Sequence, residues 1–285
     1  ADALGLDLIV VRSNSGDLVD RFEKRWNLGM ASYVDLRLYN LRGPWSSPSL
    51  KFCQSEKKIQ VLGPYLSKRL RGETIVNVVG IRREESVGRS NAPVVKEDTR
   101  YAKPNNRHGT RMLLWHPGVE FLKDEVFEIN RIDGIPLAKS YELGSSRHSC
   151  ALCIMGSKND LSVGAAGHPW LYKHYVEMEA KTTFAFQAGR WLADARPELL
   201  GEEVLSRIAL AKDRAAERRS IEASLPKQHR FVKGWPLLVP TLQEAEDIQQ
   251  GRAMILRHHQ AANIYNTARK VRDRFAELIE ARSAK

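Results

Sequence analysis

The sequence has few cysteines and no long hydrophobic run. Three cysteines among 285 residues are too few, and odd in number, for the disulfide framework of a small secreted domain. No stretch approaches the roughly 18 apolar residues of a membrane helix, and the first residues lack the apolar core of a signal peptide. These absences predict a cytoplasmic protein whose cysteines are metal ligands, a redox pair or core thiols.

Acidic residues are also scarce relative to basic ones. The chain has 45 Lys and Arg against 34 Asp and Glu, a formal net charge of +11. A positive excess of this size favours a polyanionic partner, either the phosphates of a nucleotide or a nucleic acid. A solvated basic surface is the simpler alternative.

Strand-like and helix-like patterns alternate in the first part of the chain. Leu8–Val11 is short, apolar and β-branched, and residues 17–26 follow with helical spacing and Asp17 as the candidate N-cap. A second strand is expected over Thr74–Ile81. The alternation predicts an α/β domain with a mainly parallel sheet, in which ligands lie beyond the carboxyl ends of the strands.

The remaining segments predict a polar loop and a helical C-terminal part. Residues 91–111 are polar and interrupted by prolines and a glycine, which indicates a mobile loop. A short helix is expected over Leu122–Ile129, ending near Asp133 and Gly134. Beyond Pro169 the chain is helix-periodic and rich in alanine. We therefore expect an α/β domain over residues 1–165 and a helical region over residues 166–285.

Two of the cysteines lie three residues apart in the segment SSRHSCALCIMGS, residues 145–157. Cys150 and Cys153 can face one metal ion or cluster if the chain turns tightly between them. A zinc ribbon needs a second such pair, and the only other cysteine is Cys53. A cluster, a redox pair and core thiols all remain open from the spacing alone.

Several basic residues are candidates for phosphate contacts, because Arg offers a bidentate fork and Lys a point charge. These are Lys57, Lys58, Arg82, Arg83, Arg89 and Arg147. A solvated charged face accounts equally well for any one of them. His116 and His148 are candidate ligands or bases, although a single histidine is more often a structural hydrogen-bonding group.

Five segments in order resemble one known family. They are KFCQSEKK, VGIRREESVGR, WHPGVEFLKDEVFEINRIDGIP, YELGSSRHSCALCIMGSKNDL and HPWLYKHYVEMEAKT. Together they are similar to the phosphoadenosine phosphosulfate (PAPS) reductase-like family of the adenine nucleotide alpha-hydrolase, or PP-loop ATP pyrophosphatase, fold. The sulfur-transfer proteins of DNA phosphorothioation are the branch they resemble most. The resemblance covers residues 1–185.

The resemblance implies two sets of site residues. ATP or a related adenine nucleotide is expected to contact Lys57, Lys58, Gly80, Arg82, Glu85, Ser86, Arg89 and Arg147. An iron–sulfur cluster, of the 4Fe-4S type, is expected at Cys53, Cys150 and Cys153. Asp160, His148 or a non-protein group remains open as the fourth ligand. Gln54 stands where the family has a threonine.

Two family segments are missing from the sequence. The serine–glycine–glycine–x–aspartate–serine loop that holds pyrophosphate is absent, and the resemblance places it just upstream of Ala1. The glutamate–cysteine–glycine segment of true sulfonucleotide reductases is also absent, since the last cysteine is Cys153.

Three functions follow as expectations from the resemblance and its departures. The first is ATP-dependent sulfur transfer to nucleic acid or a carrier, with a cysteine desulfurase as donor and a partner subunit or second copy as further candidate partners. The second is a degenerate family member that binds DNA or protein as a regulatory subunit. The third is a sulfonucleotide reductase. An intact phosphate loop upstream would favour the enzyme over the binding subunit.

Overall fold

The computed structural model describes residues 5–283, which form two compact units. The first unit contains the described residues up to Leu18 together with Ser49–Leu143. The second unit contains Val19–Pro48 and the described residues from Gly144 onward. The chain is mixed α/β, as expected, but the division falls at residue 144, and a helix from the N-terminal part belongs to the helical unit.

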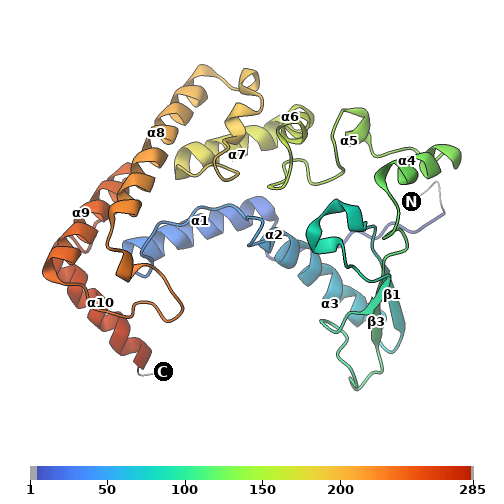
Figure 1. Cartoon of the computed structure of the whole chain (residues 1–285), viewed down its shortest axis with the longest axis horizontal. Coiled ribbons are helices and arrows are strands. Elements are labelled where there is room, and N and C mark those ends of the chain that lie inside the picture. Colours follow the sequence, from blue (N-terminus) through green and yellow to red (C-terminus); the bar gives the residue numbers. More distant parts are fainter. Residues whose placement is uncertain (1–4, 284–285) are drawn as a thin grey trace. The chain divides into compact units, whose positions relative to one another are not determined.

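A small mixed sheet organises the first unit (Figure 1). It comprises β1 (Thr74–Val78), β2 (Val95–Glu97) and β3 (Arg111–Trp115), in the order β1-β3-β2. β1 and β3 are parallel, with Thr74 opposite Arg111 and Val78 opposite Trp115. β2 pairs antiparallel with β3. The expected parallel pairing therefore holds for one pair of strands, and the sheet as a whole is mixed.

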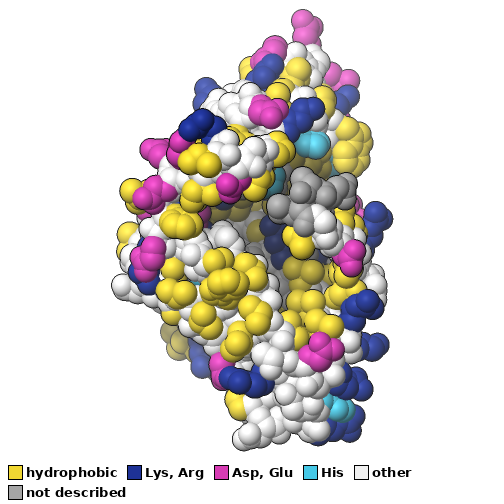
Figure 2. Space-filling view, turned by 90° about the vertical axis from the view of Figure 1, so that its right-hand side faces the viewer, with side chains coloured by type: hydrophobic (Ala, Val, Ile, Leu, Met, Phe, Trp, Pro, Cys, Tyr) yellow, Lys and Arg dark blue, Asp and Glu magenta, His cyan; other side chains and the backbone are white. Residues whose placement is uncertain are grey.

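Alternation along the strands gives this sheet two different faces. Ile75 and Met112, paired in the register, are buried against Leu66 and Tyr101. The opposite face exposes apolar side chains, with Val78 57% and Val95 49% exposed, together with Val76 and Trp115. Figure 2, which views the right-hand side of Figure 1, shows several groups of hydrophobic side chains at the surface.

Helices flank the strands of the first unit in sequence. α2 (Phe52–Gln54) runs through a π-helical stretch, Ser55–Ile59, into α3 (Gln60–Arg69). Two 3-10 turns, Arg83–Glu85 and Val87–Arg89, follow β1. α4 (Lys123–Ile132) confirms the helix expected over residues 122–129, and Asp133 is its C-cap residue. α5 is Lys139–Glu142.

Two expectations for the first unit are wrong. Leu8–Val11 forms no strand, and Leu8 and Val10 are 78% and 70% exposed. An apolar β-branched run becomes a strand only when a neighbour takes up its backbone hydrogen bonds, and within the described chain β1 pairs with β3 alone. The polar segment 91–111 is not wholly a loop, because Val95–Glu97 joins the sheet as β2.

The second unit is helical. Its helices are α1 (Leu18–Val34), α6 (Lys158–Gly167), α7 (Pro169–Thr182), α8 (Glu202–Ser224), α9 (Leu242–His258) and α10 (Ala268–Ser283). Short 3-10 turns occur at Leu192–Asp194, Pro197–Leu199 and Lys227–His229. α1 begins directly after Asp17, as expected. The expected C-terminal helices are confirmed, although the last periodic stretch is two helices separated by residues 259–267.

Apolar side chains from both ends of the sequence form the core of the second unit. One cluster contains Trp26, Tyr33, Leu41, Ile255 and Leu256. A second joins residues just after α1 to α8, α9 and α10; it contains Leu36, Tyr39, Leu225, Ala245, Ile248, Val271 and Phe275. Burial of these side chains fixes α1 in the helical unit.

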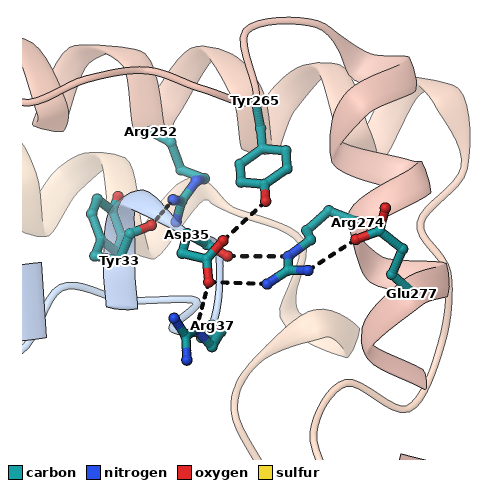
Figure 3. Close-up of polar contacts among 7 residues, drawn as sticks. All are labelled: Tyr33, Asp35, Arg37, Arg252, Tyr265, Arg274 and Glu277. Atoms are coloured by element: carbon teal, nitrogen blue, oxygen red, sulfur yellow. Dashed lines mark hydrogen bonds and ion pairs between the residues drawn. The ribbon is translucent and has the colours of Figure 1, made fainter. Parts of the chain in front are cut away.

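A polar network ties the C-terminal end of α1 to α9 and α10 (Figure 3). Arg252 is 2% exposed; it donates to the carbonyl oxygens of Leu38, at 3.1 Å, and Tyr33. Its guanidinium also lies 4.1 Å from the Tyr33 ring centroid. Asp35 accepts from Tyr265 at 3.1 Å and from Arg274 at 3.0 Å. A buried guanidinium is tolerated here because its N–H groups are hydrogen-bonded.

Candidate functional site

A groove of about 670 Å³ lies in the first unit between the sheet and the α2–α3 segment. On the sheet side it is lined by Asn77, Lys96 and Leu114, which share one face in the strand register. It continues along Val79, Ile81 and His116, which follow β1 and β3. The groove therefore reaches the carboxyl ends of two parallel strands, where α/β proteins bind ligands. Its volume is in the range of small-ligand sites.

Two adjacent lysines on the π-helical stretch have different environments. Lys58 lines the groove, and in the described chain its amine makes no hydrogen bond or ion pair. Lys57 instead donates to Ser15 O at 3.1 Å, Ser15 Oγ at 3.0 Å and Gly16 O at 2.9 Å. Since an ammonium group has three donors, Lys57 holds the turn before α1, and Lys58 is the lysine available to an anion.

The segment after β1 is a set of paired charges centred on Glu85. Arg82 contacts Glu84 at 2.9 Å and Glu85 at 3.6 Å, and Arg89 pairs with the other oxygen of Glu85. Of the predicted residues in this segment, Arg89 lines the groove. Each guanidinium has more donors than these pairs use, so Glu85 fixes two arginines that retain unused N–H groups.

The other predicted residues of this segment do not line the groove. Gly80 has open space where a side chain would be. Ser86 is extended between the two 3-10 turns. Arg83 pairs with Glu120 and donates to Ala92 O at 2.9 Å, so it anchors the loop that follows.

The sequence reasoning missed the polar groove residues that follow Val95. Lys96, Arg100 and Tyr101 come from the segment expected to be a mobile loop. Arg100 is engaged by Asp98, whose pKa is lowered by that hydrogen bond. The apolar pair Val94 and Val95 was the local signal of the strand that includes Lys96. His116 lines the groove but is 4% exposed, and its Nδ1 lies 2.7 Å from Pro93 O, a structural role.

The Cys150–Cys153 segment lies in the second unit, in the loop before α6. Cys153 Sγ accepts a hydrogen bond from Met155 N at 3.4 Å, and Arg147 Nη2 lies 3.9 Å from the same sulfur. Cys150 is exposed and Cys153 half-buried. Donors of this kind stabilise the electron-rich sulfur of a thiolate or a metal-bound cysteine. Arg147, which the resemblance assigned to nucleotide contacts, therefore lies beside Cys153 in this structure.

Asp160 clamps the two ends of the cysteine loop. Its carboxylate accepts from Ser146 N at 2.8 Å, Ser146 Oγ at 3.0 Å and Ser157 N at 2.9 Å, while Asp160 N donates to Ser157 Oγ at 3.1 Å. Burial raises the pKa of Asp160, but the hydrogen bonds from Ser157 and Ser146 outweigh it and hold the pKa below its usual value. Asp160 is thus occupied in shaping the loop, which argues against it as the fourth ligand.

Two further residues that the sequence reasoning missed shape this loop. Gln187 Nε2 donates to Ile154 O at 2.9 Å and Gly156 O at 2.8 Å. A Cβ at Gly164 of α6 would lie 1.8 Å from Ala151 O. The cysteine loop therefore packs directly on the backbone of α6. A glycine within a helix, which costs about 1 kcal/mol relative to alanine, was the available signal.

The cysteines are divided between the two units. Cys53 lies in α2 of the first unit, and Cys150 and Cys153 lie in the second. In residues 5–283 no group of three His, Cys, Asp or Glu side chains forms a metal-binding cluster. The Cys150–Cys153 loop nevertheless fits a thiolate-bound group, because it presents two thiols and N–H donors directed at a sulfur. The three-cysteine ligand set stays a prediction.

No family model, curated protein or solved structure matches the chain. Across the helices the structure describes, none combines the length and the apolar character needed to cross a membrane. The fold and the candidate sites together describe a mixed α/β protein. Its first unit has a groove with basic side chains beside two parallel strands, and its second unit has the cysteine loop.

Proposed function

We propose that the protein is an adenine-nucleotide-dependent sulfur-transfer enzyme, as its resemblance to the PAPS reductase-like family implies. The observation that supports this most directly is the groove beyond β1 and β3, with Lys58 and Arg89 in its lining. Cations at the carboxyl ends of parallel strands suit a polyphosphate. We place the activity in the cytoplasm, where free thiols persist.

In this proposal ATP occupies the groove. Lys58 and Arg89 neutralise phosphate charge, and Glu85 fixes the orientation of Arg89. Tyr101, whose ring lines the groove, is available to stack on the adenine. An oxygen of the acceptor attacks the α-phosphate, which forms an acceptor–AMP ester and releases pyrophosphate. Sulfide then displaces AMP, so that one C–O or P–O bond is replaced by a bond to sulfur without net oxidation.

The cysteine loop is proposed to hold an iron–sulfur cluster through Cys150 and Cys153, with Cys53 as the third predicted ligand. When bound, such a cluster supplies a site at which sulfide is held. Arg147 and the backbone of Met155 stabilise the negative charge at Cys153. Asp160 keeps the loop closed through its hydrogen bonds to Ser146 and Ser157.

ATP binding tests the groove. We expect calorimetric titration with Mg-ATP to show binding that is weakened at least tenfold in Lys58→Ala and in Arg89→Ala. Lys68→Ala is the matched control, because Lys68 is an exposed lysine of the same unit outside the groove. No binding, or equal affinity in all four proteins, would contradict the assignment.

A regulatory or DNA-binding subunit is the second candidate function. The observation that favours it is the formal net charge of +11, which suits a polyanion such as DNA. An assay with ATP, sulfide and DNA distinguishes the two candidates. The enzyme is expected to form AMP and pyrophosphate in a DNA-dependent manner. The binding subunit retains DNA in a salt-sensitive manner and consumes no ATP.

A further inference from the structure

The loop that connects α8 to α9, residues 225–241, exposes large apolar side chains (Figure 1). Six such side chains, counting the first residue of α9, are at least 41% exposed: Phe231, Val232, Leu237, Leu238, Val239 and Leu242. Three of them, Leu237–Val239, are consecutive and lie between two buried prolines. Single exposed apolar residues are ordinary, whereas a group of them marks a surface that contacts something apolar.

This loop is anchored to the helical unit at several points. Arg282 and Arg272 of α10 donate to the carbonyl oxygens of Pro236 and Pro240, each at 2.9 Å. Trp235, one residue before Pro236, packs on the buried core cluster that joins α8, α9 and α10. The apolar side chains are therefore exposed from a loop whose backbone is held in place.

The same part of the chain is basic and contains no acidic residue. Residues 223–243 include no Asp or Glu. The loop cations are Lys227, Arg230 and Lys233; all three are exposed, and their side chains make no hydrogen bond or ion pair in residues 5–283. A further cation, Arg42, lies 5.0 Å from the ring centroid of Phe231. The loop therefore combines apolar surface with positive charge that no carboxylate of its own segment neutralises.

Positive and apolar groups are also neighbours in space. A Cβ at Gly234 would lie 3.5 Å from Arg282 Nη1 and 3.9 Å from Leu237 Cδ2, so a guanidinium and an exposed leucine flank the same point. Glu244 is the first carboxylate after the loop. It accepts from Thr241 N at 2.7 Å and so caps α9, which leaves the charge of the loop positive.

We propose that the α8–α9 loop docks on the surface of an anionic lipid bilayer. Leu237–Val239 enter the acyl region, and the loop cations contact the lipid phosphates. Binding at a membrane surface needs both features, because its strength scales with the apolar area buried and with attraction to anionic lipids. A nucleic acid suits the loop less well, since the aliphatic side chains cannot stack on bases. The inference is independent of the proposed sulfur transfer, because no residue of the groove or the cysteine loop takes part.

Sedimentation of the full chain with lipid vesicles tests the proposal. Vesicles of phosphatidylcholine alone are compared with vesicles that also contain phosphatidylglycerol. Each basic residue near an anionic surface contributes about fivefold in affinity. The three loop cations together should therefore make binding to the anionic vesicles about 100-fold stronger than binding to phosphatidylcholine, and added salt should weaken it. Binding to neither kind of vesicle, or equal binding to both, would overturn the proposal.

Paired variants separate docking of the loop from general attraction of a basic protein. The double variant Leu237→Ser, Leu238→Ser should lose most of the vesicle binding, whereas Leu28→Ser, Leu210→Ser, which changes two leucines of similar exposure elsewhere in the helical unit, should retain it. The triple variant Lys227→Gln, Arg230→Gln, Lys233→Gln should lose binding, whereas Arg207→Gln, Arg219→Gln, Arg269→Gln, with the same change in net charge outside the loop, should bind normally.

Two results with these variants would refute the site. Equal loss in the loop variants and their controls would show attraction by net charge alone. Retention of DNA that the loop cations support and the two leucines do not, without binding to vesicles, would assign the loop to nucleic acid instead. Circular dichroism of each variant confirms that it is folded, as expected for changes at exposed side chains.

Discussion

Replacement of Gly164 by alanine tests how the cysteine loop is positioned. An added Cβ would lie 1.8 Å from Ala151 O and 2.9 Å from Ala151 C. Contacts of Cβ atoms under 3.0 Å essentially never occur, so the loop or the helix must shift by at least 3.0 − 1.8 = 1.2 Å. The obstacle is backbone, which cannot rotate away as a side chain does.

The magnitude follows from two opposing effects. Alanine in place of glycine within an unobstructed helix stabilises by up to about 1 kcal/mol. Overpacking typically costs about 1–3 kcal/mol. Gly167 lies in the same helix with nothing within 4 Å of its added Cβ. We therefore expect Gly167→Ala to be neutral or stabilising and Gly164→Ala to destabilise by about 1–3 kcal/mol.

Urea denaturation followed by circular dichroism measures the stability of the two variants. The rate at which a thiol reagent modifies Cys150 and Cys153 in the folded protein reports on the loop. Gly164→Ala should raise this rate and lower the amount of iron bound after anaerobic purification, whereas Gly167→Ala should change neither. Equal stability and equal thiol reactivity in the two variants would refute the direct packing of the loop on α6.

Three further outcomes are expected. Burial raises the pKa of Glu179 to about 7, although backbone N–H donors including those of Leu192 and Phe186 oppose it. The folded state then holds a proton more tightly than the unfolded chain, so the free energy of unfolding should fall by about 2–3 kcal/mol between pH 5 and pH 8. Urea denaturation at several pH values measures this slope, and Glu179→Gln should abolish it. A free energy of unfolding that rises with pH would contradict the prediction. Arg252→Ala should cost about 3 kcal/mol because two buried carbonyls lose their donor; exposed Arg257→Ala is the control, and equal midpoints would disprove this. Gly63→Ala should push the Tyr101 ring, 2.1 Å from the added Cβ, toward the groove and weaken Mg-ATP binding; unchanged affinity would exclude Tyr101 from the site.

Local pattern predicted the helices of this chain well and its sheet poorly. α1, α4 and α8 carry their own signals, since a helix satisfies its backbone hydrogen bonds within one segment. A strand depends on a neighbour that the sequence does not identify. Leu8–Val11 has the composition of a strand and forms none, whereas the polar Val95–Glu97 becomes one beside β3.

The sequence likewise predicted some residues of the candidate sites and not others. Lys58 and Arg89 were named from the sequence and line the groove, but Lys57 could not be distinguished from Lys58 until its bonds to Ser15 and Gly16 were seen. Tyr101 reaches the groove only because the backbone after β2 turns there. A cavity of about 460 Å³ in the helical unit is lined by side chains of α1 together with those of α7 and α8, which are distant from α1 in sequence, and no local pattern indicates it.

Iron and acid-labile sulfide content after anaerobic purification tests the proposed sulfur chemistry most directly. The protein is compared with the triple variant Cys53→Ala, Cys150→Ala and Cys153→Ala, with circular dichroism as the control for folding. The account predicts several irons and sulfides per chain in the parent protein and none in the variant. A parent protein without iron, beside a variant that folds normally, would contradict the cluster and favour the binding subunit.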